Sequence, residues 1–297
     1  MRSSCLLLIL LFGSLTSSPQ DNASETQLFN QSDLKLISSE YSFTEGASPD
    51  KQGNVFFTDQ PNDKIWKFSL DGKLSVFLEK SGRANGTYFD KAGNLIACAD
   101  EKGELWSIDK NGRVTIIMSK LQGKQANGPN DLWIDSKGGI YFTDPYYQRD
   151  YWTRTAPDLE SENVYYLSKD RKTCRVVAGN LVRPNGIVGT PDGKYLYVAD
   201  AQDGKTYQYT IAKNGDLTDR KLLINKGSDG MTLDSKGNIY LTGNGVSIYS
   251  PQGNFIAQIK VPEGTTNLCF SGKNRDILFI TARKSIYTIP MKVKGVE

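Results

Sequence analysis

Histidine is absent from the 297-residue sequence. Without it, the chain cannot build a Ser-His-Asp triad, a Cys-His dyad or a zinc site of the usual histidine type. Any chemistry must therefore use carboxylates, amides, hydroxyls, lysine or arginine side chains, thiols or a hard metal ion.

An excess of charge of one sign is missing too. Lysine and arginine total 36, aspartate and glutamate total 33, and the net charge is only +3. Nucleic-acid-binding domains normally carry a clustered basic excess, so we expect no nucleic-acid partner. Aromatic residues at 10% and 28 glycines argue against a disordered chain and favour a β-rich one with many tight turns.

Long apolar runs are lacking apart from one near the N-terminus. Arg2 precedes an apolar run over residues 5–12, and small polar residues follow as far as Ser18. This pattern is typical of a secretory signal peptide, and the run is too short to cross a bilayer. We predict a signal peptide over residues 1–18, a flexible segment over residues 19–33, and no membrane contact after the leader is removed. The mature protein is then expected to be secreted or periplasmic.

Cysteine is scarce as well. Only Cys98, Cys174 and Cys269 lie beyond the leader. An odd number with wide spacing argues against a disulfide framework and against a metal knuckle. The simplest interpretation is that they are small buried side chains in strands, with a Cys98–Cys269 bridge as the alternative.

What the chain does have is one unit repeated six times. Each copy has a turn, in most copies of the form Asp-x-x-Gly, and then an alternating aromatic and aliphatic strand, which in several copies ends in Thr-Asp or Ala-Asp. Most copies continue with a second strand and an Asp-Gly or Asn-Gly hairpin turn. Six small antiparallel sheets of roughly 40–50 residues predict an all-β fold, a six-bladed β-propeller. We assign residues 34–297 to this single domain and expect residues 34–39 to complete the last blade and close the ring.

Each unit also places Glu, Asp or Asn at one equivalent position. It lies eight residues before the turn glycine, or before Arg275, which occupies the glycine slot of the sixth copy. The six residues are Glu45, Asn85, Asn130, Asn185, Asp229 and Asn267. Because inner strands line the channel of a propeller, these positions should form a ring around its axis.

Two interpretations of this ring compete. Short polar side chains can cap strand starts by bonding nearby backbone, which accounts for one or two such residues more easily than for six out of six. Converging oxygen donors without nitrogen ligands suit a hard cation, Ca²⁺ before Mg²⁺. The sequence therefore predicts a central metal site.

Five short motifs occur in the order and register of the units: Thr44-Glu45-Gly46, Asn127-Gly128-Pro129-Asn130-Asp131, Phe142-Thr143-Asp144-Pro145, Arg183-Pro184-Asn185-Gly186 and Ser228-Asp229-Gly230. Together they resemble the gluconolactonase/regucalcin (SMP-30) family, and the resemblance runs from about residue 43 to the C-terminus. It implies a six-bladed propeller that binds one divalent metal, usually Ca²⁺, with Mg²⁺, Mn²⁺ or Zn²⁺ as alternatives.

The resemblance also implies roles for individual residues. Glu45, Asn185 and Asp229 would bind the metal, Asn130 would be a fourth ligand or a substrate contact, and Asp229 would be the acid/base residue. Animal regucalcins carry an arginine that contacts the sugar two residues before the position of Asn130. This chain has Gly128 there, so the sugar specificity stays open.

The implied function is that of a secreted, monomeric, Ca²⁺-dependent lactonase that opens a sugar lactone such as gluconolactone. One alternative is a phosphotriester or ester hydrolase on the same site. Another is a non-catalytic propeller that binds a ligand or protein around a structural metal.

The longest spacing between units lies between the third and the fourth and contains residues 145–162. This segment is rich in aromatic residues, and it is either a lid over the channel mouth or a long loop packed on its own side chains. Its Tyr147, together with Asn130 and Asp131, is our set of candidate substrate contacts.

Overall fold

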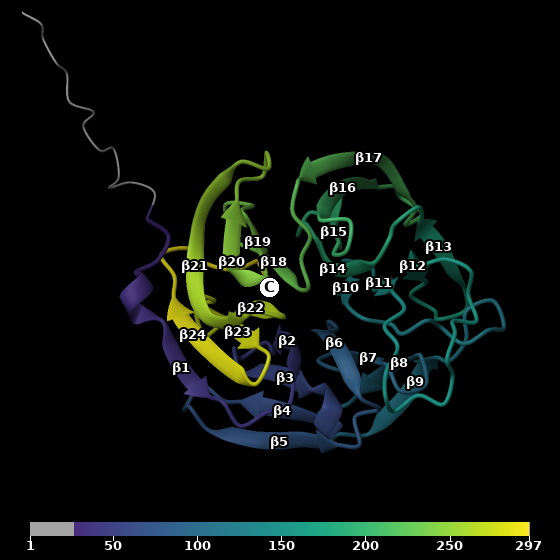
Figure 1. Ribbon diagram of the computed structural model, residues 1–297, viewed down its shortest axis with the longest axis horizontal. Coiled ribbons are helices and arrows are strands. Elements are labelled where there is room, and N and C mark those ends of the chain that lie inside the picture. Colours follow the sequence, from purple (N-terminus) through teal and green to yellow (C-terminus); the bar gives the residue numbers. More distant parts are fainter. Residues whose placement is uncertain (1–26, 297) are drawn as a thin grey trace, which may run out of the picture.

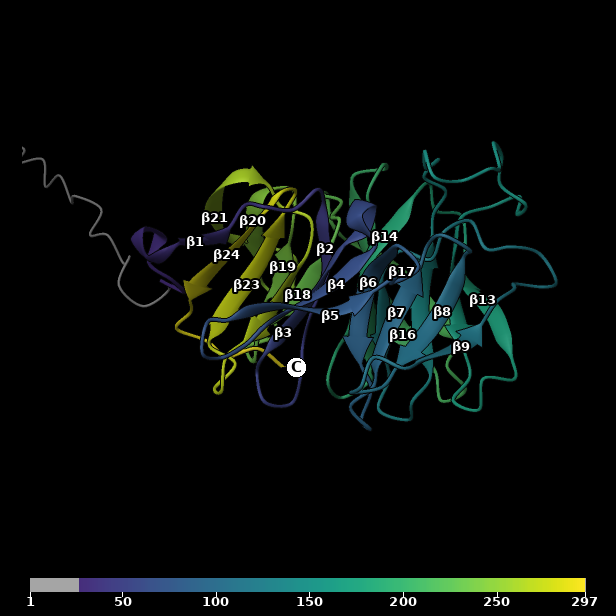
Figure 2. The ribbon, with the colours of Figure 1, turned by 90° about the horizontal axis from the view of Figure 1, so that it is seen from below.

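The computed structural model describes residues 27–296, so the predicted signal peptide lies outside the described residues. The described chain forms six four-stranded antiparallel sheets arranged around one axis (Figure 1). Viewed from the side, the ring is a disc with its connecting loops on two faces (Figure 2). The predicted six-bladed propeller is confirmed.

The first three blades are consecutive in sequence, each with its first strand innermost: β2 (Thr44–Pro49), β3 (Val55–Asp59), β4 (Lys64–Phe68) and β5 (Leu74–Glu79); β6 (Ala84–Phe89), β7 (Leu95–Ala99), β8 (Glu104–Ile108) and β9 (Val114–Met118); β10 (Leu132–Ile134), β11 (Ile140–Asp144), β12 (Asn163–Leu167) and β13 (Cys174–Ala178). Two short 3₁₀ helices, η1 (Gln31–Asp33) and η2 (Gln60–Asn62), lie outside the sheets.

The next two blades follow the same order, and the sixth combines both ends of the chain: β14 (Pro184–Gly189), β15 (Tyr195–Asp200), β16 (Lys205–Ile211) and β17 (Leu217–Ile224); β18 (Met231–Leu233), β19 (Ile239–Leu241), β20 (Asn244–Tyr249) and β21 (Phe255–Gly264); β22 (Leu268–Ser271), β23 (Ile277–Ala282), β24 (Ser285–Pro290) and β1 (Lys35–Ser38).

Strand β1 closes the ring. It pairs antiparallel with β24, with Lys35 opposite Thr288, and Figure 1 shows the two strands side by side at the edge of the last blade. This confirms the expected closure. The segment predicted to be flexible is described only from residue 27, and this part packs on the ring: Leu28 is buried, and Phe29 bridges to Met291.

The core lies between neighbouring blades. The first and second strands are buried along their whole length in most blades, as in β2, β3 and β11, whereas the outermost strand β17 is largely exposed and β9 is partly exposed. Aromatic residues supply much of the contact: Trp133 and Tyr141 of blade three, whose rings are 5.8 Å apart, belong to the same buried cluster as Val188 and Tyr197 of blade four. Cys98 and Cys269 are buried in strands without a bridge, as the simplest interpretation predicted, whereas Cys174 is a free thiol that is only partly buried.

The repeated turns have a local cause. In the first copy, the Asp50 carboxylate accepts hydrogen bonds of 2.9 Å from the backbone N–H groups of Gly53 and Asn54. Gly53 has φ +101°, a conformation that strongly favours glycine. Among residues 27–296, no helix is long and apolar enough to cross a membrane.

Candidate active site

The six ring residues lie at the inner ends of the blades, as predicted. Three of them begin or closely follow the start of an inner strand, and three lie one or two residues before it. All are buried except Asp229, which is partly exposed. The ring is therefore a real feature of one face of the propeller.

The Thr-Asp strand endings explain why this ring is so regular. The threonine at that position hydrogen-bonds across to the next blade: Thr58 donates to the carbonyl of Asn85, and Thr143 donates to the carbonyl of Asn185 at 2.8 Å. The aspartate clamps the segment leading into its own blade, since Asp144 accepts from the backbone N–H groups preceding Asn130, those of residues 127 and 128. Sequence reasoning found the motif but not this positioning role.

Glu45, Asn185 and Asp229 form one connected cluster. The Asn185 amide Nδ2 donates to Asp229 Oδ1 at 2.7 Å, and the side chains of Glu45 and Asp229 are hydrogen-bonded to each other. These residues come from the first, fourth and fifth blades, so the cluster spans the axis. Three of the four predicted metal ligands are thus brought together.

The two carboxyl groups of this cluster both have raised pKa values. Burial raises the pKa of Glu45 well above its ordinary value, and the negative charges of Asp229 and Asp131 raise it further. Burial also raises the pKa of Asp229, to about 6, although hydrogen bonds with Asn185 and Glu45 oppose the shift. Ionising both of these neighbouring carboxyl groups costs free energy, because burial and the like charge both disfavour the ionised form, unless a cation lies beside them.

The residues present fit a hard divalent cation. The Asn185 Oδ1 atom is buried and has no hydrogen-bond partner within the described chain, which leaves one amide oxygen free beside two acidic side chains. The described chain holds no group of three or more His, Cys, Asp and Glu side chains poised for a metal, so amide oxygens must contribute. Oxygen donors of this kind are those Ca²⁺ and Mg²⁺ prefer.

Of the three predicted substrate contacts, Tyr147 is seen to hydrogen-bond to the cluster. Tyr147 reaches the cluster, because its hydroxyl accepts a 3.1 Å hydrogen bond from Asn185 Nδ2. The Asp131 carboxylate is turned to the backbone, accepting from Leu132 N–H at 2.9 Å. The main chain of Asn130 is fixed by a bond from Gly86 N–H to its carbonyl at 2.6 Å. The assignments of Asn130 and Asp131 stay predictions.

Crowding of the inner strands makes Gly46 critical. It has φ +56°, and a Cβ there would lie far inside van der Waals contact of the Asn85 carbonyl oxygen. We expect Gly46→Ala to destabilise the fold strongly and to disturb the adjacent Glu45. Gly93 is the matched control, since its φ is +88° but nothing lies within 4 Å of its Cβ position. Gly93→Ala should cost only about 1 kcal/mol, the backbone term alone. Denaturant unfolding of both variants measures this, and equal losses would contradict the crowding argument.

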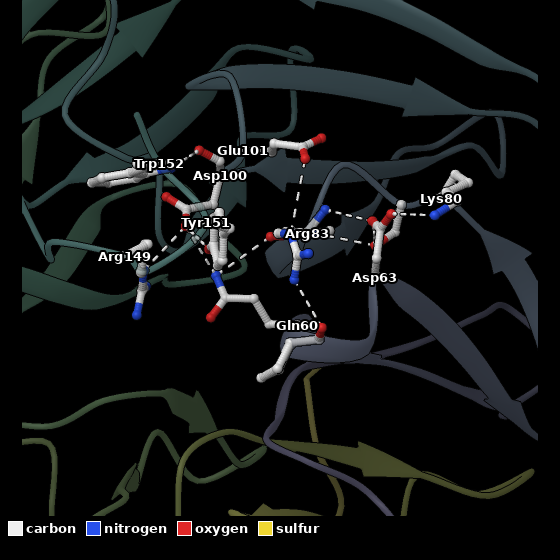
Figure 3. Close-up of polar contacts among 12 residues, drawn as sticks. Gln60, Asp63, Lys80, Arg83, Asp100, Glu101, Arg149, Tyr151 and Trp152 are labelled. Atoms are coloured by element: carbon white, nitrogen blue, oxygen red, sulfur yellow. Dashed lines mark hydrogen bonds and ion pairs between the residues drawn. The ribbon is translucent and has the colours of Figure 1, made fainter. Parts of the chain in front are cut away.

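The β11–β12 loop, residues 145–162, is fastened to blade two by Asp100. This carboxylate, 2% exposed, accepts hydrogen bonds from Arg149 Nε at 3.1 Å, from Gln60 Nε2 at 3.2 Å and from the Tyr151 hydroxyl. The indole N–H of Trp152 donates to the Asp100 carbonyl at 3.2 Å. Figure 3 shows these groups converging, with Arg83 beside Tyr151.

The same loop carries Tyr147 to the cluster. The Tyr147 ring lies between the guanidinium groups of Arg183 and Arg149, at 4.8 and 5.3 Å. The loop also packs on its own aromatic residues, with Tyr146 and Trp152 rings 5.7 Å apart. The packing of the loop on its own side chains is therefore confirmed, and the lid stays a prediction. Asp100 and Arg183 were missed, although Asp100 stands in the recognisable Ala-Asp ending of its strand.

Removing the Asp100 charge should release this loop. We expect Asp100→Asn to leave Arg149 without its buried partner and to speed tryptic cleavage after Arg149 and Arg154. Because Tyr147 would lose its support, Ca²⁺ affinity should fall several-fold. Glu101→Gln is the control, because Glu101 is an exposed neighbour paired only loosely with Arg83, at 3.9 Å. If both variants resist trypsin like the wild type, Asp100 does not hold the loop.

A hollow of about 990 Å³ opens beside Asp229. Its wall is formed by blades five, six and one: Ser42, Phe43, Gly243, Asn244, Pro262, Glu263, Gly264, Thr265, Thr266, Arg283 and Lys284. Its volume falls in the range of small-molecule sites. A group bound here would contact Asp229 directly.

Comparison with known proteins identifies the family of this propeller. Residues 43–284 match the model of the SMP-30/gluconolactonase/LRE-like region. The chain belongs to this family. A curated gluconolactonase of Zymomonas mobilis is 29% identical over 294 residues, covering 88% of this chain and 82% of that relative.

Solved structures agree with family membership. A putative gluconolactonase superposes with a TM-score of 0.84 at 28% identity, covering 91% of this chain and 96% of the other. A gluconolactonase of Xanthomonas campestris gives 0.82 at 25% identity, covering 87% and 89%. Regucalcin of Agrobacterium tumefaciens, a calcium-binding protein, gives 0.74 at 20% identity, covering 88% and 94%, and supports the fold alone.

Proposed function

We propose that this family member is a lactone hydrolase that requires a divalent cation, Ca²⁺ in the first place, held by Glu45, Asn185 and Asp229 with Asn130 as a fourth ligand. The observation that carries the proposal is the hydrogen-bonded pair of buried Glu45 and partly exposed Asp229, beside an unpartnered Asn185 oxygen and next to a hollow of small-molecule size. The gluconolactonase relatives support a lactone as the substrate.

Each side chain then has a part in opening the ring. A bound cation would polarise the lactone carbonyl as a Lewis acid. Asp229 is the partly exposed member of the pair and lines the hollow, so it takes a proton from the attacking water and returns it to the departing ring oxygen. The Asn185 amide orients Asp229 through their 2.7 Å bond, and Tyr147 orients Asn185 in turn.

Hydrolysis of glucono-1,5-lactone tests the proposal. The purified protein should be active with Ca²⁺, inactive after chelation, and restored by Ca²⁺ in preference to Mg²⁺, Mn²⁺ or Zn²⁺. Asp229→Asn should remove activity. Activity that chelation leaves intact would contradict the metal requirement. Hydrolysis of phosphotriesters or simple esters without lactones would favour the alternative hydrolase, and Ca²⁺ binding without any hydrolysis would favour a non-catalytic propeller.

We further propose that the protein is exported after cleavage near residue 18 and works as a monomer. The apolar run at residues 5–12 supports export. N-terminal sequencing of protein recovered outside the cytoplasm should begin near residue 19, and a mature protein that starts at Met1 would contradict export.

A further inference from the structure

The hollow beside Asp229 has a cationic wall. Arg283 and Lys284 both line it. Lys226 lies next to it, because a Cβ built on the lining residue Gly243 would be 3.7 Å from Lys226 Nζ. Three positive side chains therefore lie at or beside this hollow, and a neutral sugar lactone has no charge for them to bind.

These charges are not neutralised by the protein. Within residues 27–296, no carboxylate lies within ion-pairing distance of Lys226, Arg283 or Lys284. Apart from Asp229, Glu263 is the acidic residue of the wall, and its Oε1 already accepts from the hydroxyls of Ser285 and Tyr287. The cations are free to bind a ligand.

The arginine side chains around Tyr147, which do not line the hollow, are different. Arg149 is paired with Asp100 at 3.1 Å, and Arg183 lies 3.7 Å from Glu162. Both guanidinium groups also flank the Tyr147 ring. An anionic substituent on the substrate would therefore be attracted to the side of blades five, six and one.

The position of Arg283 is fixed relative to the cluster. Its φ is +51°, and its carbonyl accepts hydrogen bonds from Thr44 N–H at 2.6 Å and Thr44 Oγ1 at 3.0 Å. Thr44 directly precedes Glu45. The side chain then lies along Gly264, where a Cβ would be 3.3 Å from Arg283 Nε. A side chain at position 264 would compete for this space.

We propose that the substrate is a lactone that carries a second, negatively charged group, a carboxylate or a phosphate, which binds Arg283 and Lys284 while the lactone carbonyl lies at Asp229. This inference rests on the proposed lactonase activity and adds the substrate class. In the reaction, water adds to the acyl carbon, the bond from that carbon to the ring oxygen breaks, and the ring oxygen takes a proton. The product is a hydroxy acid with two anionic groups.

The test compares three lactones: neutral glucono-1,5-lactone, a phosphorylated gluconolactone and a glucaric acid monolactone, which carries a carboxylate. We expect a higher kcat/KM for one or both charged lactones, with the advantage shrinking as ionic strength rises. In Arg283→Gln and Lys284→Gln, the ratio of kcat/KM for the charged lactone to that for the neutral one should fall about tenfold, mainly through KM, since a charge-assisted hydrogen bond is lost.

Lys236→Ala is the control, because Lys236 is exposed in the turn between β18 and β19, at the other end of the inner strands. It should leave the ratio unchanged. Equal use of neutral and charged lactones, or equal losses for both in Arg283→Gln, would overturn this inference and leave the lactonase proposal standing. If none of the three lactones is hydrolysed, the lactonase proposal itself is overturned. The two charged lactones distinguish phosphate from carboxylate recognition.

Discussion

Replacing Glu45 by glutamine is expected to stabilise the metal-free protein and to remove its further stabilisation by Ca²⁺. In the wild type, Glu45 is buried against the negative charges of Asp229 and Asp131, which raises its pKa well above the ordinary value. At neutral pH this environment opposes folding, because the buried carboxyl group must either take up a proton or remain charged beside Asp229 and Asp131, and a neutral side chain of the same shape avoids both costs. The melting temperature in chelator should rise by about 2–4 °C for each kcal/mol gained.

The same substitution removes one of the two carboxylates available to a cation. Ca²⁺ affinity depends strongly on the number of ligand charges, so it should fall by orders of magnitude, and lactonase activity should fall with it. Asp229→Asn should behave in the same way.

Asn85→Ala provides the matched comparison. Asn85 occupies a ring position but lies outside the cluster of Glu45, Asn185 and Asp229. Calorimetric titration and thermal unfolding, each with and without Ca²⁺, separate the two effects. A variant Asn85→Ala that lost Ca²⁺ while Glu45→Gln retained it would show that the ligands are assigned wrongly.

A second large effect is expected in the pH dependence of stability, whose slope should change sign with Ca²⁺. Without metal, the pKa values of Glu45 and Asp229 are raised, the latter to about 6. Carboxyl groups with a raised pKa contribute their stability below the unfolded-state pKa and lose it as pH rises through the folded-state pKa. Metal-free protein should therefore lose stability between about pH 4 and pH 7.

With saturating Ca²⁺ the cation favours the ionised carboxylates and lowers their pKa values. Stability is then present above the unfolded-state pKa and is lost as pH falls. If one proton leaves per metal bound, the pH midpoint of binding should move about one unit towards acid for each tenfold increase in Ca²⁺. Activity at saturating Ca²⁺ should accordingly persist well below the range in which a histidine-dependent enzyme fails.

Other buried acids could mimic this behaviour. Burial raises the pKa of Asp144 to about 7 and raises that of Asp100 as well. Urea unfolding across pH should therefore be compared between the wild type and Glu45→Gln, so that these contributions cancel. Identical pH profiles for the two proteins would contradict a raised pKa of Glu45 in the metal-free protein.

The ring of Glu, Asp and Asn residues could be predicted from the sequence because the residues that position it recur in most of the repeated units. Most copies carry their own turn aspartate, and several also carry a strand-ending threonine such as Thr58 or Thr143, which hydrogen-bonds to the backbone of the next blade. The spacing from the turn glycines therefore predicts the ring positions of Glu45, Asn185 and Asp229.

What could not be predicted depends on a departure from that repetition. Asp59, Asp144 and Asp200 each clamp the backbone leading into their own blade. Asp100 stands at the equivalent position and instead holds the β11–β12 loop through Arg149, Tyr151 and Gln60. The repeat in the sequence does not show that Asp100 has hydrogen-bond partners different from those of the equivalent aspartates. The hollow beside Asp229 also escaped prediction, because it is bounded by segments from opposite ends of the chain.

The closure of the ring by β1 has a consequence for folding. Glu45 follows the first strand, which joins the last blade through its pairing with β24, whereas Asp229 lies in the fifth blade. The cluster therefore comes together only when contacts distant in sequence have formed, which is a slow, late event in chains of high contact order. Ca²⁺ bound there would stabilise the native state and not the transition state for folding. It would slow the opening of the ring and leave the rate of its assembly nearly unchanged.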